Sequence, residues 1–256
     1  MPQRPDFWGL PHPWGPILVY SVLGLAFAAL LVRLYRRGGT WFEAGLPEKR
    51  SGRVPGRLGR VVLNAILQLG ILRQKFPGVM HLCLVLSIFI FFLGTVLASL
   101  HSHVYPILAG SVFLAYKTTL NLAILLFTAG LGMALFRRCL KRPPHLSSDP
   151  RFTWVLILLA LSVYEGAFLE SFHLAIEQPE WGGLATVDWA LARTWLALEV
   201  PLASLQTWHG ILYGLHVITV AVILVTFPSS PLLHILTTTL TVYFTDPDQP
   251  LGRLAP

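Results

Sequence analysis

Long apolar stretches alternate with short polar segments along the chain. Five of these stretches are close to the roughly 20 residues that a helix needs to cross a lipid bilayer. They lie at residues 17–35, 79–100, 111–135, 152–172 and 207–227. The pattern predicts an all-α membrane protein, a five-transmembrane-helix bundle that forms a single membrane domain over residues 1–256.

A second pattern occupies the segment between the first two spans. From residue 57 to residue 72, polar side chains recur at three- and four-residue spacing, and apolar side chains form the opposite stripe. The polar positions are Arg57, Arg60, Asn64 and Gln68. Such a stripe is typical of an amphipathic helix that lies along the membrane surface. Binding to anionic lipid is the simpler interpretation, and docking of a soluble partner is the alternative.

Composition also indicates that lipid surrounds the chain. Only 12% of the residues are charged and 54% are hydrophobic, whereas soluble domains carry about 25% charged residues. The net charge of +7 has no soluble basic domain to carry it. We therefore expect a lipid bilayer as the surroundings and no nucleic acid as a partner.

Basic residues are distributed unevenly between the two sides of the predicted bundle. Segments 33–78, 136–151 and 228–256 contain ten, five and one of the 19 Lys and Arg residues. The segments of the other side contain only Arg4 and Arg193. Because basic residues gather on the cytoplasmic side of a membrane protein, this asymmetry predicts that the N-terminus lies outside and the C-terminus is cytoplasmic.

Histidines are arranged regularly on the last span. His209 and His216 are seven residues apart, so they share one helix face about 10 Å apart along its axis. His234 follows eighteen residues after His216, and five whole turns would return it to the same face if the helix continued.

The second span offers histidines at matching heights. His81 lies at its inner end, and His101 and His103 lie about 30 Å away at its outer end. Haem b that is bound without covalent attachment takes two neutral imidazoles from neighbouring helices. The angle around an ideal helix favours His103 over His101 as the outer partner. The alternatives are a proton or metal-ion transporter that uses intramembrane histidines, or a haem-free membrane anchor.

The cysteines limit which redox centres the chain can hold. It has two cysteines, Cys83 and Cys139, and no C-x-x-C motif. Neither an iron–sulfur cluster nor covalent haem can be attached by such a set. Any cluster must therefore belong to a partner, and we expect no disulfide because both cysteines lie toward the cytoplasm.

Specific residues around two of the spans resemble a known family. His216 is followed by Phe-Pro-Ser-Ser at residues 227–230 and then by His234, and the run Arg-Gln-Lys-Phe-Pro-Gly-Val-Met-His ends at His81. These motifs resemble the gamma subunit of respiratory nitrate reductase. They are also similar to the related membrane cytochrome b parts of heterodisulfide reductase-like oxidoreductases, as is the pair Gly94-Thr95.

This resemblance implies a function in electron transport. It implies one or two b-type haems, with His81 and His234 as ligands of the inner one. It also implies electron exchange between menaquinone or ubiquinone and a cytoplasmic iron–sulfur oxidoreductase subunit, in the prokaryotic cytoplasmic (inner) membrane. Chemistry on any other substrate would take place in the partner.

One position departs from the nitrate reductase pattern. There the second helix supplies another haem histidine ten residues after the first, but this chain has Phe91, which cannot ligate iron. An outer haem therefore needs a different pair of ligands. The available histidines are His209 and His216 on the last span and His101 and His103 on the second.

The resemblance also indicates candidate residues for quinone. Lys117 lies about two turns inside the third span, where a lysine is costly unless it snorkels to the interface or serves a ligand. The nitrate reductase family has a lysine at its quinol site near the outer end of this helix. Glu170 matches an acidic position of the heterodisulfide reductase-like branch and is a candidate proton acceptor. His173 is expected to be an interfacial hydrogen-bonding group.

Overall fold

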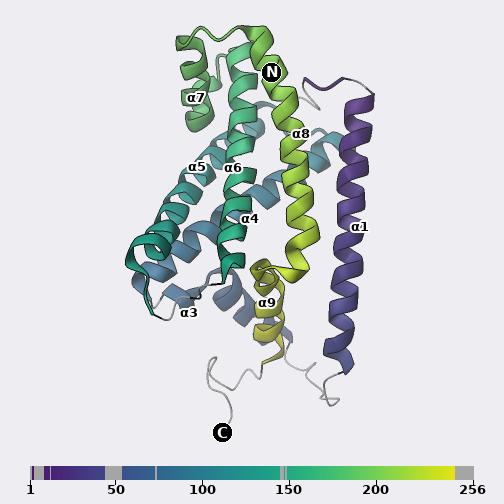
Figure 1. Cartoon of the computed structure of the whole chain (residues 1–256), viewed down its shortest axis with the longest axis vertical. Helices are drawn as coiled ribbons and strands as arrows, with labels where there is room; N and C mark the ends of the chain where they lie inside the picture. Colours follow the sequence, from purple (N-terminus) through teal and green to yellow (C-terminus); the bar gives the residue numbers. More distant parts are fainter. Residues whose placement is uncertain are drawn as a thin grey trace.

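The computed structural model of the chain describes residues 2, 9–11, 13–43, 54–72, 74–144, 147 and 149–245. Over these residues the fold is helical and contains no β-strand (Figure 1). The helices in chain order are α1 (Trp14–Glu43), α2 (Val54–Val61), η1 (Val62–Ile66), α3 (Leu69–Leu72), α4 (Lys75–His103), α5 (Gly110–Leu135), η2 (Phe136–Lys141), α6 (Pro150–Glu177), η3 (Gly182–Leu184), α7 (Thr186–Ala197), α8 (Leu202–Thr226), η4 (Phe227–Ser229), η5 (Pro231–Leu233) and α9 (His234–Phe244).

Five helices in the described part of the chain are long and apolar enough to cross a membrane, which confirms the five predicted spans by length and composition. They are α1, α4, α5, α6 and α8. Some extend beyond their predicted limits, because α4 continues to His103 and α8 begins at Leu202. His101 and His103 are therefore helical residues.

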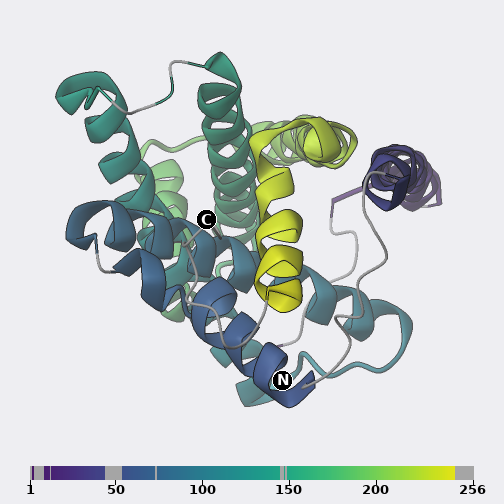
Figure 2. The ribbon, with the colours of Figure 1, turned by 90° about the horizontal axis from the view of Figure 1, so that it is seen from below.

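The long helices are arranged as two pairs with α1 outside them. α4 packs along α5, α6 packs along α8, and α1 contacts α8. Figure 2 shows α1 at the edge of the bundle, beside α8. The short helix α7 packs against α6 at one end of the molecule, and α2, α3 and α9 lie at the other end (Figure 1).

Glycines allow α4 and α5 to approach each other closely. A Cβ atom on Gly94 of α4 would lie 2.8 Å from Leu120 Cδ2 of α5. A Cβ atom on Gly130 of α5 would lie 3.0 Å from Cys83 Cβ and from Leu84 Cγ of α4. Since lipid removes the hydrophobic drive for helix association, membrane helices depend on such close packing. The α4–α5 pair therefore forms a firm wall for the space between the two pairs.

Two arginines of α1 bind polar groups where α8 ends. Arg33 donates hydrogen bonds to the carbonyl oxygen of Val225 (2.9 Å) and to Ser229 Oγ (3.1 Å). Arg37 donates to the carbonyl oxygen of Pro228 (2.9 Å). The last carbonyl groups of a helix have no partner within it, and proline cannot continue it. The arginines thus stabilise the bend that leads from α8 into α9.

The segment predicted as one amphipathic helix over residues 57–72 is divided into α2, η1 and α3. The division falls at Gln68, whose φ is +56°. Arg57 is only 7% exposed. Its guanidinium donates to the carbonyl oxygens of Tyr243 (2.8 Å) and Thr245 (3.1 Å), at the end of α9. The segment is therefore attached to α9 through the polar stripe that was expected to face water or lipid headgroups.

The segment that joins α6 to α8 folds back over the end of α6. Trp195 Nε1 donates to Ser171 Oγ (3.0 Å), and the ring of Trp181 stands edge-on to that of Phe113, with centres 5.1 Å apart. Beneath them lies a core of buried apolar side chains: Phe172, Leu174, Ala175, Ala185, Ala192 and Leu205. This packing fixes the first turn of α7, which carries Asp188.

Candidate functional site

Two histidines from different helices face each other at the end of the bundle that carries α2 and α9. His81 lies in the second turn of α4, and His234 is the first residue of α9. Their ring centres are 5.9 Å apart, with an angle of 64° between the ring planes. Two imidazoles on opposite sides of one metal ion, with bonds of about 2 Å each, have ring centres about 6 Å apart. His81 and His234, the inner pair, have this separation.

Each ring of the inner pair has one nitrogen engaged by an oxygen atom. His81 Nδ1 lies 2.7 Å from Gln68 Oε1, and His234 Nδ1 lies 2.6 Å from the carbonyl oxygen of Pro231. Because amide and carbonyl oxygens only accept hydrogen bonds, Nδ1 is the donor in both rings and Nε2 keeps its lone pair. Histidines that ligate metals are typically held in this way. The inner pair therefore offers two Nε2 lone pairs at a ring separation close to that of two ligands on opposite sides of one metal ion.

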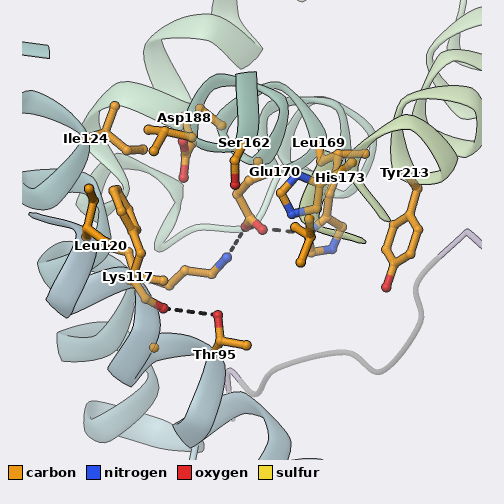
Figure 3. Close-up of a pocket in the computed structure, with 18 of the residues that line it drawn as sticks. Thr95, Lys117, Leu120, Ile124, Ser162, Leu169, Glu170, His173, Asp188 and Tyr213 are labelled. Atoms are coloured by element: carbon orange, nitrogen blue, oxygen red, sulfur yellow. Dashed lines mark hydrogen bonds and ion pairs between the residues drawn. The ribbon is translucent and has the colours of Figure 1, made fainter. Parts of the chain in front are cut away.

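A cavity of about 420 Å³ lies between the α4–α5 pair and the α6–α8 pair. Most of its wall is apolar, but several ionisable side chains also line it (Figure 3). They are Lys117 on α5, Glu170 and His173 on α6, Asp188 on α7, and His209 and His216 on α8. An apolar wall with a few convergent polar groups is typical of a small-molecule site. We call this space the central cavity.

Lys117 and Glu170 form an ion pair in the central cavity (Figure 3). The lysine is only 7% exposed, and its Nζ also lies 5.6 Å from the ring centre of Phe113. His173 Nδ1 lies 3.6 Å from Glu170 Oε1. The Glu170 carboxylate thus compensates the charge of Lys117, and the lysine does not snorkel to the membrane interface. The structure brings the two predicted quinone residues together and adds His173, which is buried.

Asp188 is held beside this ion pair by a side chain of α5. Asn121 Nδ2 donates to Asp188 Oδ2 (2.9 Å), and Asn121 Oδ1 accepts from the backbone N–H groups of Val187 (2.9 Å) and Asp188 (3.1 Å). Asp188 Oδ1 is buried and has no hydrogen-bond partner within the described residues. Burial and then the charge of Glu170 raise the pKa of Asp188 to about 7, against the lowering effects of Lys117 and the Asn121 bond. Asp188 can therefore exchange a proton near neutral pH.

His216 is accompanied by a carboxylate of α6. Glu165 Oε2 lies 3.4 Å from His216 Nδ1, and Glu165 Oε1 accepts a hydrogen bond from Thr219 (3.1 Å). Phe91 of α4 lines the same cavity as His216. In the nitrate reductase pattern this position is a haem histidine, whereas the phenyl ring of Phe91 cannot ligate iron.

His101 and His103 do not line the central cavity in the described structure. His103 Nε2 lies 2.6 Å from the hydroxyl of Tyr20 on α1, and His103 Nδ1 donates to the carbonyl oxygen of Ser99 (2.8 Å). His101 Nδ1 accepts from the backbone N–H of Leu108 (2.9 Å). The structure therefore brings His209 and His216 to the cavity but does not bring the two proposed partners to face them.

Several groups around these sites were not predicted as site residues. They are Gln68, Asn121, Glu165, His173 and Asp188. For Asn121, Glu165 and His173 a signal existed, because polar side chains at membrane depth are usually functional. Asn121 also follows Lys117 by four residues, on the same helix face. Asp188 had no such signal, since nothing in the sequence indicates that α7 folds back over the cavity.

No family model, curated protein or solved structure matches the chain. Within the described residues, no three His, Cys, Asp or Glu side chains converge as they would around a protein-bound metal ion. Haem needs only two axial ligands, because its porphyrin supplies the others. The geometry of the inner pair and of the central cavity thus carries the functional inference.

Proposed function

We propose that the chain is the membrane cytochrome b subunit of an oxidoreductase complex, and that it passes electrons between quinone and a cytoplasmic iron–sulfur subunit. The inner pair carries this proposal, because the rings of His81 and His234 have the separation of two axial ligands and each has an oxygen atom at its Nδ1. A haem b in this position supplies reversible one-electron transfer at its iron. The motif resemblance to the nitrate reductase gamma subunit and its relatives supports the same residues as ligands.

The central cavity is the proposed site for menaquinone or ubiquinone. Its apolar wall suits a quinone ring, and the ion pair of Lys117 and Glu170 can bind a ring oxygen. Asp188 and Glu170 are the proposed proton-exchanging groups, since the two protons of a quinol must leave with its electrons. His209 and His216 are polar wall groups in this proposal, which uses one haem for each chain.

Helix α4 connects the two proposed sites. His81 and Ile88, which lines the central cavity, are seven residues apart on this helix. Two helical turns correspond to about 10 Å along the axis. This is the axial distance from His81 to the near end of the central cavity.

The charge distribution supports a cytoplasmic location for the inner pair. Basic residues are concentrated in segments 33–78 and 136–151 and nearly absent from the segments of the other side. By the positive-inside rule the N-terminus is outside, in a prokaryotic inner membrane, and the inner pair faces the cytoplasm. An iron–sulfur partner would then dock near His81 and His234.

Proton transport is the second candidate function. The ionisable side chains from four helices that line the central cavity favour it over metal-ion transport, which would need a convergent ligand set. A haem-free anchor is the third possibility. A reduced-minus-oxidised absorption spectrum of the purified chain separates these functions, because the first predicts Soret and alpha bands of b-type haem. Their absence, together with proton flux into vesicles that contain the chain, would favour transport.

A further inference from the structure

We infer that Gln68 is a positioning residue for the proposed haem ligand His81 and that it sets the electron-donor strength of that imidazole. This inference rests on the proposed function, since it concerns the inner haem. It begins from the break in the segment 54–72. The backbone at Gln68 adopts φ +56°, a left-handed conformation that is unfavourable for residues other than glycine.

The break changes the direction of the Gln68 side chain. In a continuous helix Gln68 would lie on the polar stripe with Asn64 and Arg60, four and eight residues before it. In the structure it is only 4% exposed, and its Oε1 lies 2.7 Å from His81 Nδ1. The unfavourable backbone conformation thus accompanies a buried bond to a proposed ligand.

The neighbouring backbone fixes this arrangement. The carbonyl oxygen of Gln68 accepts from the N–H groups of Ile71 (3.0 Å) and Leu72 (3.2 Å), so Gln68 starts the short helix α3. A Cβ atom on Gly78 of α4 would lie 2.5 Å from the carbonyl oxygen of Ile71. Gly78 therefore permits α3 to lie directly on α4, less than one helical turn before His81.

The same segment also reaches the second proposed ligand. Its other end carries Arg57, which donates to the carbonyl oxygens of Tyr243 and Thr245 where α9 ends. His234 is the first residue of α9. The segment 54–72 thus contacts both helices that carry the inner pair. Its contact with α4 is made directly to the proposed ligand His81.

The chemical consequence concerns His81 Nε2. An acceptor at Nδ1–H increases the electron density of the imidazole and makes Nε2 a stronger donor. A stronger donor stabilises the ferric state and lowers the reduction potential of a haem. A carboxylate at position 68 would accept more strongly than the amide, and removal of the side chain would leave no acceptor from this residue.

The test is a series of potentiometric titrations of the purified chain with Gln68→Glu, wild type and Gln68→Gly. Glycine tolerates a positive φ, so the Gly variant removes the bond while it keeps the backbone conformation. We expect the midpoint potential to fall in Gln68→Glu and to rise in Gln68→Gly. The electron paramagnetic resonance signal of the ferric haem should also change in both variants, since it depends on ligand strength and ring orientation.

Gln74→Gly is the matched control, because Gln74 is exposed and its side chain does not cap α4. It should leave the potential and the resonance signal unchanged. If Gln68→Gly fails to retain haem, the direction of the midpoint-potential shift in Gln68→Glu still tests the proposed role of Gln68. If the haem of Gln68→Glu has the wild-type midpoint potential or a higher one, the proposed role of Gln68 is wrong. The proposed function is unaffected by that result. A wild-type chain without haem overturns the proposed function, and this inference with it.

Discussion

Lys117 and Glu170 form an ion pair inside the bundle, between a helix of the α4–α5 pair and a helix of the α6–α8 pair. Both side chains line the central cavity, and the lysine is almost completely buried. A buried charge is costly unless an opposite charge compensates it. The ion pair therefore contributes both to the stability of the bundle and to the electrostatics of the proposed quinone site.

Replacement of one partner should destabilise the fold more than replacement of both. Lys117→Met leaves the Glu170 charge uncompensated, with an expected loss of about 3–5 kcal/mol. The double variant Lys117→Met/Glu170→Gln should recover part of this loss, because it buries no unpaired charge. Thermal unfolding in detergent measures the stabilities. Quinol-driven reduction of the haem should be slow in both variants.

Lys141→Met provides the control, because Lys141 is exposed at the far end of the same transmembrane span, where its Nζ lies 5.9 Å from the ring centre of Phe76. It should lose at most about 1 kcal/mol of stability and react as the wild type does. If the loss of stability in the double variant equals the sum of the losses in Lys117→Met and Glu170→Gln, the two charges do not compensate each other.

The stability should also depend on pH through Asp188. Its pKa is about 7 in the folded chain, compared with 3.8 for an unperturbed aspartate. Between these values the folded state keeps a proton that the unfolded state has lost. The contribution of Asp188 to the free energy of unfolding therefore falls as the pH rises from about 4 to 7. Asp188→Asn removes this contribution, so its melting temperature relative to wild type should increase over that range and then level off.

Asp149 gives the opposite behaviour and serves as the comparison. The hydrogen bond from the Arg151 side chain, and then that from its backbone, lowers the pKa of Asp149. That contribution is present above the unperturbed pKa and is lost as the pH falls, so Asp149→Asn should lose stability relative to wild type at neutral pH. An Asp188→Asn difference that is constant with pH would contradict the raised pKa of Asp188.

The five spans could be predicted from the sequence because each depends only on a local property, about 20 consecutive apolar residues. The amphipathic segment could be predicted only in part. Its three- and four-residue spacing indicates a helix, but the break at Gln68 depends on His81 and Gly78 in another helix. A local periodicity contains no information about such a contact.

Gly130 and Gly132 of α5 should differ sharply in their tolerance of a methyl group. In Gly130→Ala the new Cβ would lie 3.0 Å from Cys83 Cβ and 3.1 Å from the backbone nitrogen of Leu84. We expect this crowding to cost about 1–3 kcal/mol. Gly132→Ala on the same helix meets nothing within 4 Å and should be neutral or stabilising by up to about 1 kcal/mol. Unfolding of the two variants in one detergent tests the difference, and equal stabilities would contradict the close helix contact.

The number of haems should be one for each chain. His101 and His103 have other hydrogen-bond partners, and Phe91, which lines the central cavity, cannot ligate iron. Pyridine haemochrome analysis against protein concentration gives the ratio. His216→Leu should keep a ratio of one while it slows reduction by quinol. A ratio of two that falls to one in this variant would show that His216 ligates an outer haem.

The candidate sites differ in how far sequence could predict them. The two residues of the inner pair were predicted as haem ligands from motif resemblance, and the structure brings their ring centres to 5.9 Å. The helix periodicity that was expected to align His234 with His216 does not hold, because α8 ends at Thr226 and two short turns precede His234. The ion pair was predictable only as two separate candidates, since the contact of Lys117 with Glu170 requires the packing of α5 near α6. The role of Asp188 required the position of α7, which is set by tertiary packing around Ala185 and Ala192.

The most direct test of the proposed function is the haem content of ligand variants. His81→Ala and His234→Ala should each abolish the alpha band of low-spin b-type haem in the reduced-minus-oxidised spectrum of the purified chain. His101→Ala, on the same helix as His81, should retain the wild-type spectrum. If His81→Ala keeps its full haem content with an unchanged alpha band, the inner pair does not bind haem and the proposed function is contradicted.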